Sequence, residues 1–425
     1  MLYSNKMRII YLHQYFNTPD MSGGTRSYEM ARRLVANGHE VHMITCLRSE
    51  TDHSDWFSTM EAGINVHWFP VRYDNTMSFW RRMKAFFEFA FKATGKAISV
   101  GGDIVFATST PLTIAIPGII TSKKLKIPMV FEVRDLWPEM PIAIGALKNP
   151  LLKFLAKKFE KLAYFNSKAI VALSPGMKAG ILATNFPRER VAVIPNSSDC
   201  EWFRDKYHGP DSKLEVKYPW LKDSPLIIYT GTLGALNGVA YLSQLAKRTL
   251  EKSSNIKFLV IGGGAEYNLV KDTAKRLGVL NINFFMLERL PKKDMPLMYK
   301  RATFVSSLFV SVKEMESNSA NKFFDGLAAQ KPLLINYSGW HADLLRKNNA
   351  GLVLAGKGFD DAANDIIKAV KDTQCMREMG KNSSILADTF FDREILALQL
   401  EKVLLYAVNK TSTFPEDIAS GKYFK

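Results

Sequence analysis

Short runs of β-branched and apolar residues alternate along the chain with stretches that have the 3.6-residue period of helices. This alternation is typical of parallel β-α-β units, and it occurs twice. The predicted strands of the first half are residues 8–13, 40–45, 64–69, 104–107, 129–132, 169–172 and 191–194, and those of the second half are residues 226–229, 257–261, 282–285, 304–306, 332–335 and 351–354.

A stretch of mixed charge without clear periodicity separates the two halves. It covers residues 196–224 and contains two prolines and a glycine, which interrupt regular structure. We therefore predict an α/β protein with two doubly wound domains, residues 1–200 and 225–390, joined by a linker at 201–224. Residues 391–425 are predicted to form a C-terminal helix and tail that cross back to the first domain.

Composition fits two full-sized cores, since 47% of the 425 residues are apolar, including 27 Phe. The net charge of +16 favours an anionic partner, which can be nucleic acid, anionic lipid or a phosphorylated metabolite. Three scattered cysteines indicate reduced thiols and a cytoplasmic location. The long uncharged run at 104–122 is interrupted by Pro111 and Pro117, so we predict a strand, a loop and a short helix there rather than a membrane span.

A pair of glycines, Gly23 and Gly24, stands just before a predicted helix of the first half, and Thr25 is suited to cap that helix. Glycines at a helix N-terminus let backbone N–H groups approach an anion. The spacing does not match the dinucleotide-binding fingerprint. A flexible strand-to-helix loop explains the pair equally well.

A charged cluster follows the strand predicted at 129–132. Glu132, Arg134 and Asp135 stand there, at the carboxyl end where open α/β sheets bind ligands. Buried charges are costly unless they are used or paired. A ligand site and an internal ion pair of Arg134 with Asp135 or Glu132 are both compatible with the pattern.

In the second half, glycine-rich loops follow two consecutive predicted strands, which supports a phosphate-binding role. A predicted helix that starts at Asn321 carries Lys322 and Asp325 one turn apart. This pair is either a surface ion pair or, together with the glycine loops, a site for a phosphate and a sugar diol. The loop residues are Gly231, Thr232, Gly234 and Asn237 in the first loop and Gly263 in the second.

Taken in order, these segments resemble the retaining glycosyltransferases of family 4, which have the GT-B architecture of two Rossmann-like domains facing a central cleft. The similarity extends from Met7 to about Tyr406. A narrower resemblance is to bacterial O-antigen and capsule transferases, including N-acetyl-L-fucosamine transferases. The family resemblance is carried by Gly23–Gly24, Pro195–Asp199 with Phe203, and Asp325–Pro332, and the narrower one by His13–Phe16, Glu132–Pro138 and Asn321–Asp325.

The resemblance implies a nucleotide-sugar donor in the second domain and an acceptor in the first. Asp325 would hold the ribose, and Lys322 with the glycine loop at 231–234 would face the pyrophosphate. The cations usual in the family fall at Thr232 and Asn237, so Lys322 or Arg289 must replace them, and we favour Lys322. The family's first sugar-binding Glu aligns with Ser317, and Glu316 is one position away.

The family's common His-Asp pair reads Arg134-Asp135 here, so no catalytic histidine is transferred from the resemblance. We therefore predict front-face retention, in which the leaving phosphate helps to deprotonate the acceptor hydroxyl. Asp135 or Glu132 would orient that hydroxyl, and Arg134 and Gly24 complete the predicted catalytic set, with Gly23 beside the donor. No metal ion is expected, because no Asp-x-Asp cluster is present.

Two basic helical segments of the first half carry aromatic and aliphatic residues. Such helices suit an anionic membrane surface, although buried rings with a solvated lysine rim would give the same pattern. We predict a peripheral protein on the inner face of the cell membrane. The residues predicted to contact membrane or acceptor are Phe79, Trp80, Arg81, Arg82, Lys84 and Phe87 in the first segment and Lys153, Lys157 and Lys158 in the second.

These predictions describe a transferase that moves a sugar, such as N-acetyl-L-fucosamine, from a UDP-linked donor to a polyprenyl-pyrophosphate-linked saccharide. Two alternatives stay open: a GT-B nucleotide-sugar epimerase, and a non-catalytic protein that binds a nucleotide sugar or a membrane. Nucleic acid is the least favoured partner, because no binding motif accompanies the charge.

Overall fold

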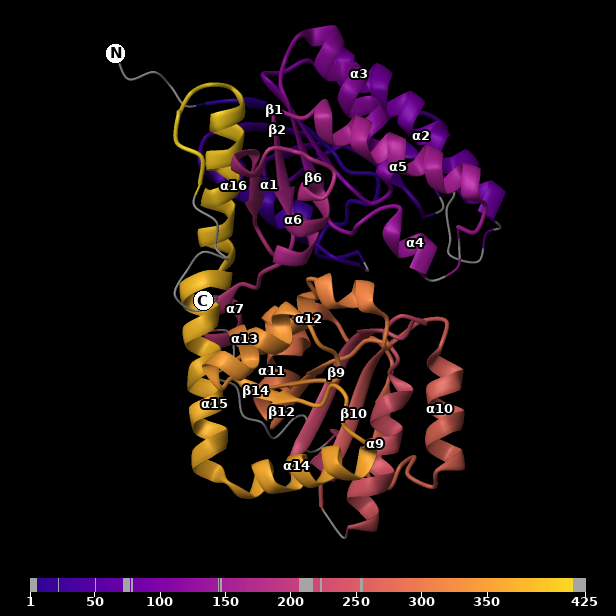
Figure 1. The fold of residues 1–425 in the computed structure, drawn as a ribbon, viewed down its shortest axis with the longest axis vertical. Coiled ribbons are helices and arrows are strands. Elements are labelled where there is room, and N and C mark those ends of the chain that lie inside the picture. Colours follow the sequence, from indigo (N-terminus) through magenta and orange to yellow (C-terminus); the bar gives the residue numbers. More distant parts are fainter. Residues whose placement is uncertain are drawn as a thin grey trace. The chain divides into compact units, whose positions relative to one another are not determined.

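The computed structural model describes residues 6–21, 23–49, 51–71, 77, 79–143, 145, 147–205, 217–221, 224–252 and 255–415. These residues form two compact units, which are described separately. The first unit holds the chain up to Pro195 and then the segment from Arg393 onward, and the second unit holds Asn196–Asp392. Figure 1 follows the chain through both units.

The first unit is built on an eight-stranded sheet that is parallel except for its first edge strand, which pairs antiparallel with its neighbour. Its buried strands are rich in Val, Ile and Phe, as expected for a sheet covered on both faces. In spatial order the strands are β3 (Phe57–Glu61), β4 (Ile64–Pro70), β2 (Glu40–Leu47), β1 (Arg8–Leu12), β5 (Ile104–Thr108), β6 (Met129–Val133), β7 (Ala169–Ala172) and β8 (Val191–Val193).

Helices cover this sheet. The last of them, α16, packs against α1, so the C-terminal part of the chain completes the first unit. An ion pair joins the two helices, with Arg33 Nε 2.7 Å from Glu394 Oε1, and His39, three residues after α1, lies with its Nε2 2.8 Å from Glu401 Oε1. The helices are α1 (Arg26–Ala36), α2 (Phe79–Val100), α3 (Ala115–Leu125), α4 (Glu139–Ala143), α5 (Pro150–Phe165), α6 (Pro175–Leu182) and α16 (Arg393–Ala407).

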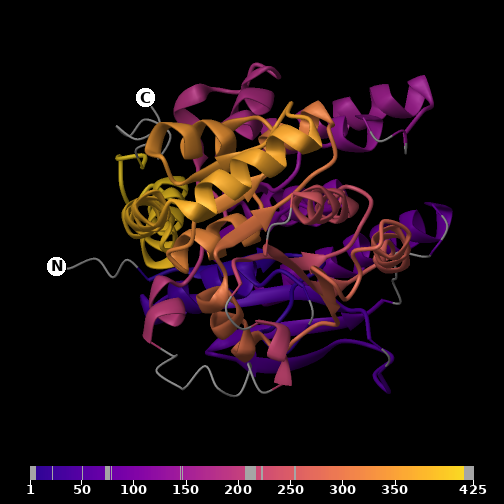
Figure 2. The ribbon, with the colours of Figure 1, turned by 90° about the horizontal axis from the view of Figure 1, so that it is seen from below.

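The second unit has a six-stranded, fully parallel sheet. In spatial order its strands are β11 (Phe284–Leu287), β10 (Lys257–Gly263), β9 (Leu226–Thr232), β12 (Phe304–Ser307), β13 (Leu333–Ile335) and β14 (Gly351–Val353). A core of apolar side chains from α9, α10, α14 and the first half of α15 packs on the sheet, and α12 packs against β12, β13 and α15 (Figures 1 and 2). The helices are α7 (Cys200–Asp205), α9 (Ala240–Glu251), α10 (Tyr267–Arg276), α11 (Met295–Arg301), α12 (Asn321–Ala328), α13 (Trp340–Asn348), α14 (Phe359–Lys371) and α15 (Thr373–Leu386).

The strands follow the sequence-based predictions closely, with two differences. The edge strand β3 was not predicted, because only a short hairpin turn at Ala62 and Gly63, both with positive φ, brings it back onto β4. Strand β11 begins two residues later than predicted, because the exposed Ile282 belongs to the preceding turn. The uncharged run at 104–122 forms β5, a short 3-10 turn and the start of α3, as predicted.

Two of the predicted domain boundaries differ from the units of the structure. Residues 196–200 belong to the second unit, although the first domain was predicted to end at 200, and the returning segment begins at Arg393 rather than at 391. Residues 206–216 and 222–223 of the predicted linker and 416–425 of the predicted tail lie outside the described residues. Within the described part of the chain, every helix is too short or too polar to cross a bilayer.

Candidate functional site

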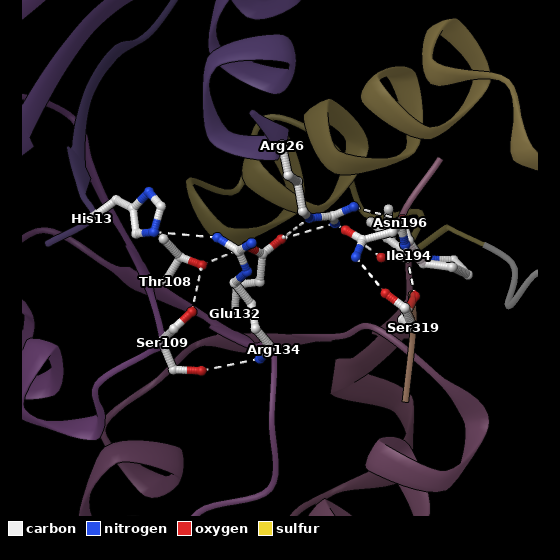
Figure 3. Close-up of polar contacts among 10 residues, drawn as sticks. His13, Arg26, Thr108, Ser109, Glu132, Arg134, Ile194, Asn196 and Ser319 are labelled. Atoms are coloured by element: carbon white, nitrogen blue, oxygen red, sulfur yellow. Dashed lines mark hydrogen bonds and ion pairs between the residues drawn. The ribbon is translucent and has the colours of Figure 1, made fainter. Parts of the chain in front are cut away.

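A buried ion pair lies at the carboxyl end of β6 in the first unit. Glu132 Oε1 accepts hydrogen bonds from Arg26 Nε at 3.0 Å and Nη2 at 2.9 Å (Figure 3). Thr108 Oγ1 donates to the other carboxylate oxygen at 2.5 Å. The Glu132 side chain is fully buried, and the positive charge of Arg26 is the largest influence that lowers its pKa against the opposing effect of burial.

This arrangement changes two predictions. Glu132 was expected to orient an acceptor hydroxyl, but both of its oxygens are occupied and none of its surface is accessible. The ion pair of Arg134 with Asp135 or Glu132, considered as an alternative, is not present among the described residues, and Glu132 pairs with Arg26 instead. Arg26 also donates to the carbonyl oxygens of Ile194 at 2.9 Å and Pro195 at 2.5 Å, so it fixes the last residues of the first unit.

Arg134 lies next to this pair and contacts a buried histidine. Its Nη1 donates to His13 Nε2 at 3.2 Å, and its backbone N–H donates to Ser109 Oγ at 3.0 Å (Figure 3). Burial, and then the positive charges of Arg134 and Arg48, hold the pKa of His13 well below its usual value. His13 is therefore neutral, and its Nδ1 carries the hydrogen because Nε2 accepts from an arginine.

Asp135 follows Arg134 and is solvent-exposed. Desolvation by the surrounding protein raises the pKa of its carboxyl to about 6, and the charge of Arg134 opposes that shift. A carboxyl group that is accessible and titrates near neutral pH is suited to exchange a proton with a bound hydroxyl. Of the two predicted acceptor-orienting carboxylates, only Asp135 is available for contact.

The loop of Gly23 and Gly24 is fixed by an asparagine. Asn17 Nδ2 donates to the carbonyl of Gly24 at 3.3 Å, and Asn17 Oδ1 accepts from Arg48 Nη2 at 2.6 Å. Gly23 has φ of 137°, and a Cβ there would lie 2.6 Å from Asn17 Nδ2, so a side chain is excluded. The predicted cap does not form, since Thr25 makes no side-chain hydrogen bond to α1.

In the second unit Lys322, on the first turn of α12, lies against the end of β9. Its Nζ donates to Tyr229 Oη at 3.1 Å and to Asn237 Oδ1 at 3.3 Å, and it lies 4.6 Å and 5.6 Å from the ring centroids of Tyr229 and Phe309. No carboxylate of the described residues pairs with it. Desolvation lowers the pKa of Lys322 to about 8, which marks an ammonium without an anionic partner.

Glycines line the adjacent loops because backbone approaches backbone there. Gly262 and Gly264 have positive φ, and a Cβ on either would collide with the carbonyl of Gly231 or Leu233. The predicted loop residues lie beside the cations: a Cβ on Gly231 would lie 3.5 Å from Lys322 Cε, and one on Gly263 would lie 3.7 Å from Arg289 Nε. Arg289 is exposed. Gly231, Thr232, Gly234, Asn237 and Lys322 are therefore brought together as predicted.

Asp325, one turn further along α12, accepts a hydrogen bond from Ser198 Oγ at 2.7 Å. Near it, Asn196 contacts the preceding loop, with its N–H donating to Ser319 Oγ at 3.0 Å and its Nδ2 to the Ser319 carbonyl at 2.5 Å (Figure 3). The Pro-Asn-Ser-Ser-Asp turn thus holds the segment from Ser319 to Asp325. Sequence reasoning identified both segments but not the hydrogen bonds between them.

The loop between β12 and α12 carries the two remaining predicted donor residues. Glu316 is exposed and Ser317 is half-buried, at the end of a short 3-10 turn. Gly339 lies tightly against this turn, because a Cβ on it would lie 2.3 Å from the Glu316 carbonyl oxygen. Sequence reasoning missed Arg26, Tyr229 and Phe309 as members of these clusters. Arg26 begins α1, Tyr229 lies within β9 and Phe309 follows β12, and no local pattern indicates their contacts.

The two helices predicted to contact a membrane surface, α2 and α5, expose different kinds of side chain. On α2, Arg81 and Lys84 are exposed and Phe87 is 43% exposed, while Phe86 and Phe89 are buried in the core. The side chains of Phe79, Trp80 and Arg82 lie outside the described residues. On α5, Lys157 and Lys158 are exposed and Lys153 is half-buried.

The exposed face of α5 is apolar, which was not predicted. Residues three, four and seven positions apart share one face of a helix, and here that face points away from the buried Ala163 and Tyr164. Six large apolar side chains of α5 are 40–64% exposed. They are Leu151, Leu152, Phe154, Leu155, Leu162 and Phe165, here called the α5 stripe.

Within the described residues, no group of three or more His, Cys, Asp or Glu side chains could hold a metal ion. The arrangement instead offers cations and backbone N–H groups at the ends of parallel strands, which suits phosphates.

Two family models match the chain. A model described as a glycosyl transferase 4-like domain covers residues 23–197, and a second, described as glycosyl transferases group 1, covers residues 211–385. The first match contains the Gly23–Gly24 loop, Glu132 and Asp135. The second contains the glycine loops, Lys322 and Asp325.

Two curated relatives have the names of glycosyltransferases, and a solved structure has a similar fold. The chain is 23% identical over 296 residues to the capsular polysaccharide biosynthesis glycosyltransferase CapM of Staphylococcus aureus, covering 68% of this chain and 76% of that protein. It is 23% identical over 268 residues to a lipopolysaccharide 1,2-N-acetylglucosaminetransferase of Salmonella typhimurium, covering 60% and 67%. The crystal structure of Anabaena HepE in complex with UDP superposes with a TM-score of 0.69 at 16% identity, covering 94% of this chain and 99% of HepE.

Proposed function

The chain belongs to the family 4 glycosyltransferases of GT-B fold, and from this premise we propose that it transfers a sugar, with retention of anomeric configuration, from a UDP-linked donor to a lipid-linked saccharide. The product would enter capsule or lipopolysaccharide synthesis, as the names of two relatives indicate for those proteins. The sugar itself is proposed to be an amino sugar such as N-acetyl-L-fucosamine, on the resemblance of the motifs.

The observation that carries the proposal is the Lys322 ammonium beside the glycine loop at 231–234. An ammonium among an amide, a phenol and two rings, without a carboxylate among the described residues, is most stable when an anion binds to it. A diphosphate supplies that anion, and Arg289 beside Gly263 supplies a second cation. Asp325 would accept hydrogen bonds from the ribose hydroxyls of the same nucleotide.

The chemistry follows from what these groups stabilise. Breaking the sugar–phosphate bond places negative charge on the leaving diphosphate, and preformed cations and N–H donors lower that barrier most. Of Asp135 and Glu132, only Asp135 is accessible, and we assign to it the orientation of the acceptor hydroxyl. Because Glu132 is buried and paired with Arg26, it supports this edge of the sheet and does not touch the acceptor.

The acceptor is proposed to lie on a membrane. Helices α2, α3 and α5 pack side by side, and their outer faces combine the α5 stripe and Phe91, 67% exposed, with exposed lysines. Charged and apolar residues together suit the headgroup region of an anionic bilayer. The exposed lysines are Lys84 and Lys92 on α2, Lys123 and Lys124 on α3, and Lys157, Lys158 and Lys161 on α5.

Donor binding and transfer test the proposal separately. Titration with UDP should show binding by the wild-type protein and a loss of about tenfold or more in Lys322→Met, while Lys368→Met, an exposed lysine on α14, should bind normally. Incubation with a panel of UDP- and GDP-sugars and membrane lipid extract should give a lipid of increased mass with one UDP-sugar. Acceptor-independent conversion of a nucleotide sugar would instead indicate an epimerase.

Three further outcomes test the chemistry. NMR of the product should show retained configuration, and an inverted anomer would overturn the mechanism. Asp135→Asn should reduce turnover while leaving UDP affinity unchanged, and full turnover in this variant would remove Asp135 from the mechanism. Activity should survive EDTA, because the proposed diphosphate site uses side-chain cations, and loss of activity with the chelator would contradict this.

A further inference from the structure

Two arginines of the first unit lie at the carboxyl ends of parallel strands without a carboxylate partner among the described residues. Arg48 follows β2 and Arg134 follows β6, and in the sheet β1 and β5 lie between these two strands. Each guanidinium contacts a neutral group. Arg134 bonds to His13 at 3.2 Å, and Arg48 bonds to the amide oxygen of Asn17 at 2.6 Å.

His13 connects the two arginines. The positive charges of both act on its ring, which is neutral and 3% exposed. Its Nε2 is occupied by Arg134, and its buried Nδ1, which carries the hydrogen, has no partner among the described residues. A buried donor without an acceptor costs about 1–3 kcal/mol in general, so such a group is usually kept for a ligand or a water.

Gln14 is a second buried side chain whose polar atoms have no hydrogen-bond partner among the described residues. Its side chain is 1% exposed, and neither the oxygen nor the nitrogen of its amide has a partner within the described residues. His13 and Gln14 are consecutive at the end of β1. Two consecutive buried side chains therefore have unused hydrogen-bonding atoms, and one of them, His13, contacts Arg134.

The negative charges nearby do not neutralise this group. Glu132 is fully engaged by Arg26 and Thr108. Asp135 is exposed, and no ion pair joins its carboxylate to Arg48 or Arg134 in the described part of the chain. The cluster keeps a net positive charge and is ready to receive an anion.

We propose that Arg48, Arg134, His13 and Gln14 form a second diphosphate site, which holds the diphosphate linking the acceptor saccharide to its lipid carrier. This inference rests on the lipid-linked acceptor proposed above and names the group by which that acceptor is recognised. Guanidinium groups bind phosphate oxygens through two parallel N–H bonds, which gives both charge and direction. The His13 Nδ1–H and the Gln14 amide would supply neutral donors to the same oxygens.

The position of the site favours the acceptor over the donor. The donor diphosphate already has Lys322 and the glycine loops of the second unit. Arg134 is 16 positions before Pro150, the first residue of α5, which carries the apolar stripe. The first unit thus contains both the anion site and an apolar, basic surface for a lipid, and one of the site's arginines, Arg134, lies on the stretch of chain that leads to α5.

Inorganic pyrophosphate tests the site without transfer activity. Protein saturated with UDP, so that the donor site is filled, should bind one further equivalent of pyrophosphate in titration calorimetry. Arg134→Gln and Arg48→Gln should each weaken that binding by about tenfold or more, and Arg134→Lys should weaken it less. Arg8→Gln is the control, because Arg8 stands at the opposite end of β1 in an ion pair with Glu40.

The transfer reaction gives the second readout. The same saccharide is offered once on a lipid diphosphate and once as an alkyl glycoside. Arg48→Gln, which lies outside the predicted catalytic set, should raise the KM of the diphosphate acceptor about tenfold and leave the KM values of the alkyl glycoside and of the donor unchanged. Equal losses on both acceptors would overturn the inference.

The outcomes separate this inference from the proposed function. A protein that binds UDP but no second equivalent of pyrophosphate overturns the acceptor site alone. Weaker UDP binding by Arg134→Gln would assign the arginines to the donor and also overturns it. A wild-type protein that binds no UDP contradicts the proposed function itself.

Discussion

Asn237 accepts a hydrogen bond from the ammonium of Lys322 across 3.3 Å, although 85 positions separate the two residues. The resemblance to other family members places a cation of the donor site at position 237, where this chain has a neutral amide. The lysine of α12 therefore brings a positive charge to the place where the strand-to-helix loop lacks one. Helix α12 and the loop after β9 act together as one diphosphate site in our proposal.

This relationship predicts a charge rescue. Lys322→Met should weaken UDP binding, and Asn237→Lys added to it should recover most of the loss, because the new ammonium starts within reach of the old position. Titration calorimetry of both variants measures the effect. Asn237→Lys alone is the control for folding. A double variant that binds no better than Lys322→Met would show that the charge is not needed at this point.

A pH dependence follows from the pKa of Lys322, which desolvation lowers to about 8 in the free protein. Only the protonated ammonium binds an anion, so UDP affinity should fall as the pH rises above about 8. Lys322→Arg, whose guanidinium stays charged, should keep its affinity up to about pH 10. The stability of the protein without UDP should instead increase as the pH rises between the folded and the unfolded pKa of Lys322, because the folded pKa is the lower of the two. A flat wild-type affinity between pH 7 and 9.5 would contradict this.

Breaking the buried ion pair should destabilise the first unit strongly. Arg26→Met leaves the Glu132 carboxylate buried without its partner, which typically costs about 3–5 kcal/mol. Urea unfolding followed by circular dichroism measures the loss. Arg248→Met removes an exposed pair with Glu251 and should change stability far less, because water screens exposed ion pairs. Equal effects of the two substitutions would mean that Glu132 is protonated or solvated when Arg26 is absent.

The α5 stripe predicts membrane binding that depends on particular apolar side chains. Phe154→Glu should reduce binding to vesicles containing anionic lipid by about tenfold, because it replaces inserted apolar area with a repelled charge. Leu269→Glu on α10 is a matched control, since Leu269 and Phe154 are both 54% exposed. Vesicle co-sedimentation at two salt concentrations measures both. If the two variants lose binding equally, or neither does, the stripe is not the docking surface.

The architecture could be predicted from the sequence because parallel strands are buried on both faces and so appear as short apolar runs. Strand β3 escaped prediction since its pairing depends on a two-residue turn with positive φ, and its own residues are partly exposed. The glycine loops were found for a similar reason: close backbone approach permits no other residue at Gly262 or Gly264.

Side-chain partners were much less predictable. The charged run after β6 correctly indicated a site, but nothing local to Glu132 shows that its partner is Arg26, 106 positions earlier. The exposed stripe of α5 was also missed, because a helix with apolar residues around most of its surface gives no sign of which face the core takes. Pairings and exposure of this kind depend on how distant elements pack, which the sequence pattern does not encode.

The return of α16 to the first unit has a consequence for how the protein is made. Arg33 of α1 contacts Glu394, and His39 just after the helix contacts Glu401. Both glutamates leave the ribosome about 200 residues after the rest of that unit. At a synthesis rate of roughly 5–20 residues per second, the nascent first unit waits on the order of 10–40 seconds with one side of α1 uncovered. The two units therefore cannot mature strictly one after the other, and the amino-terminal unit is the last to be completed.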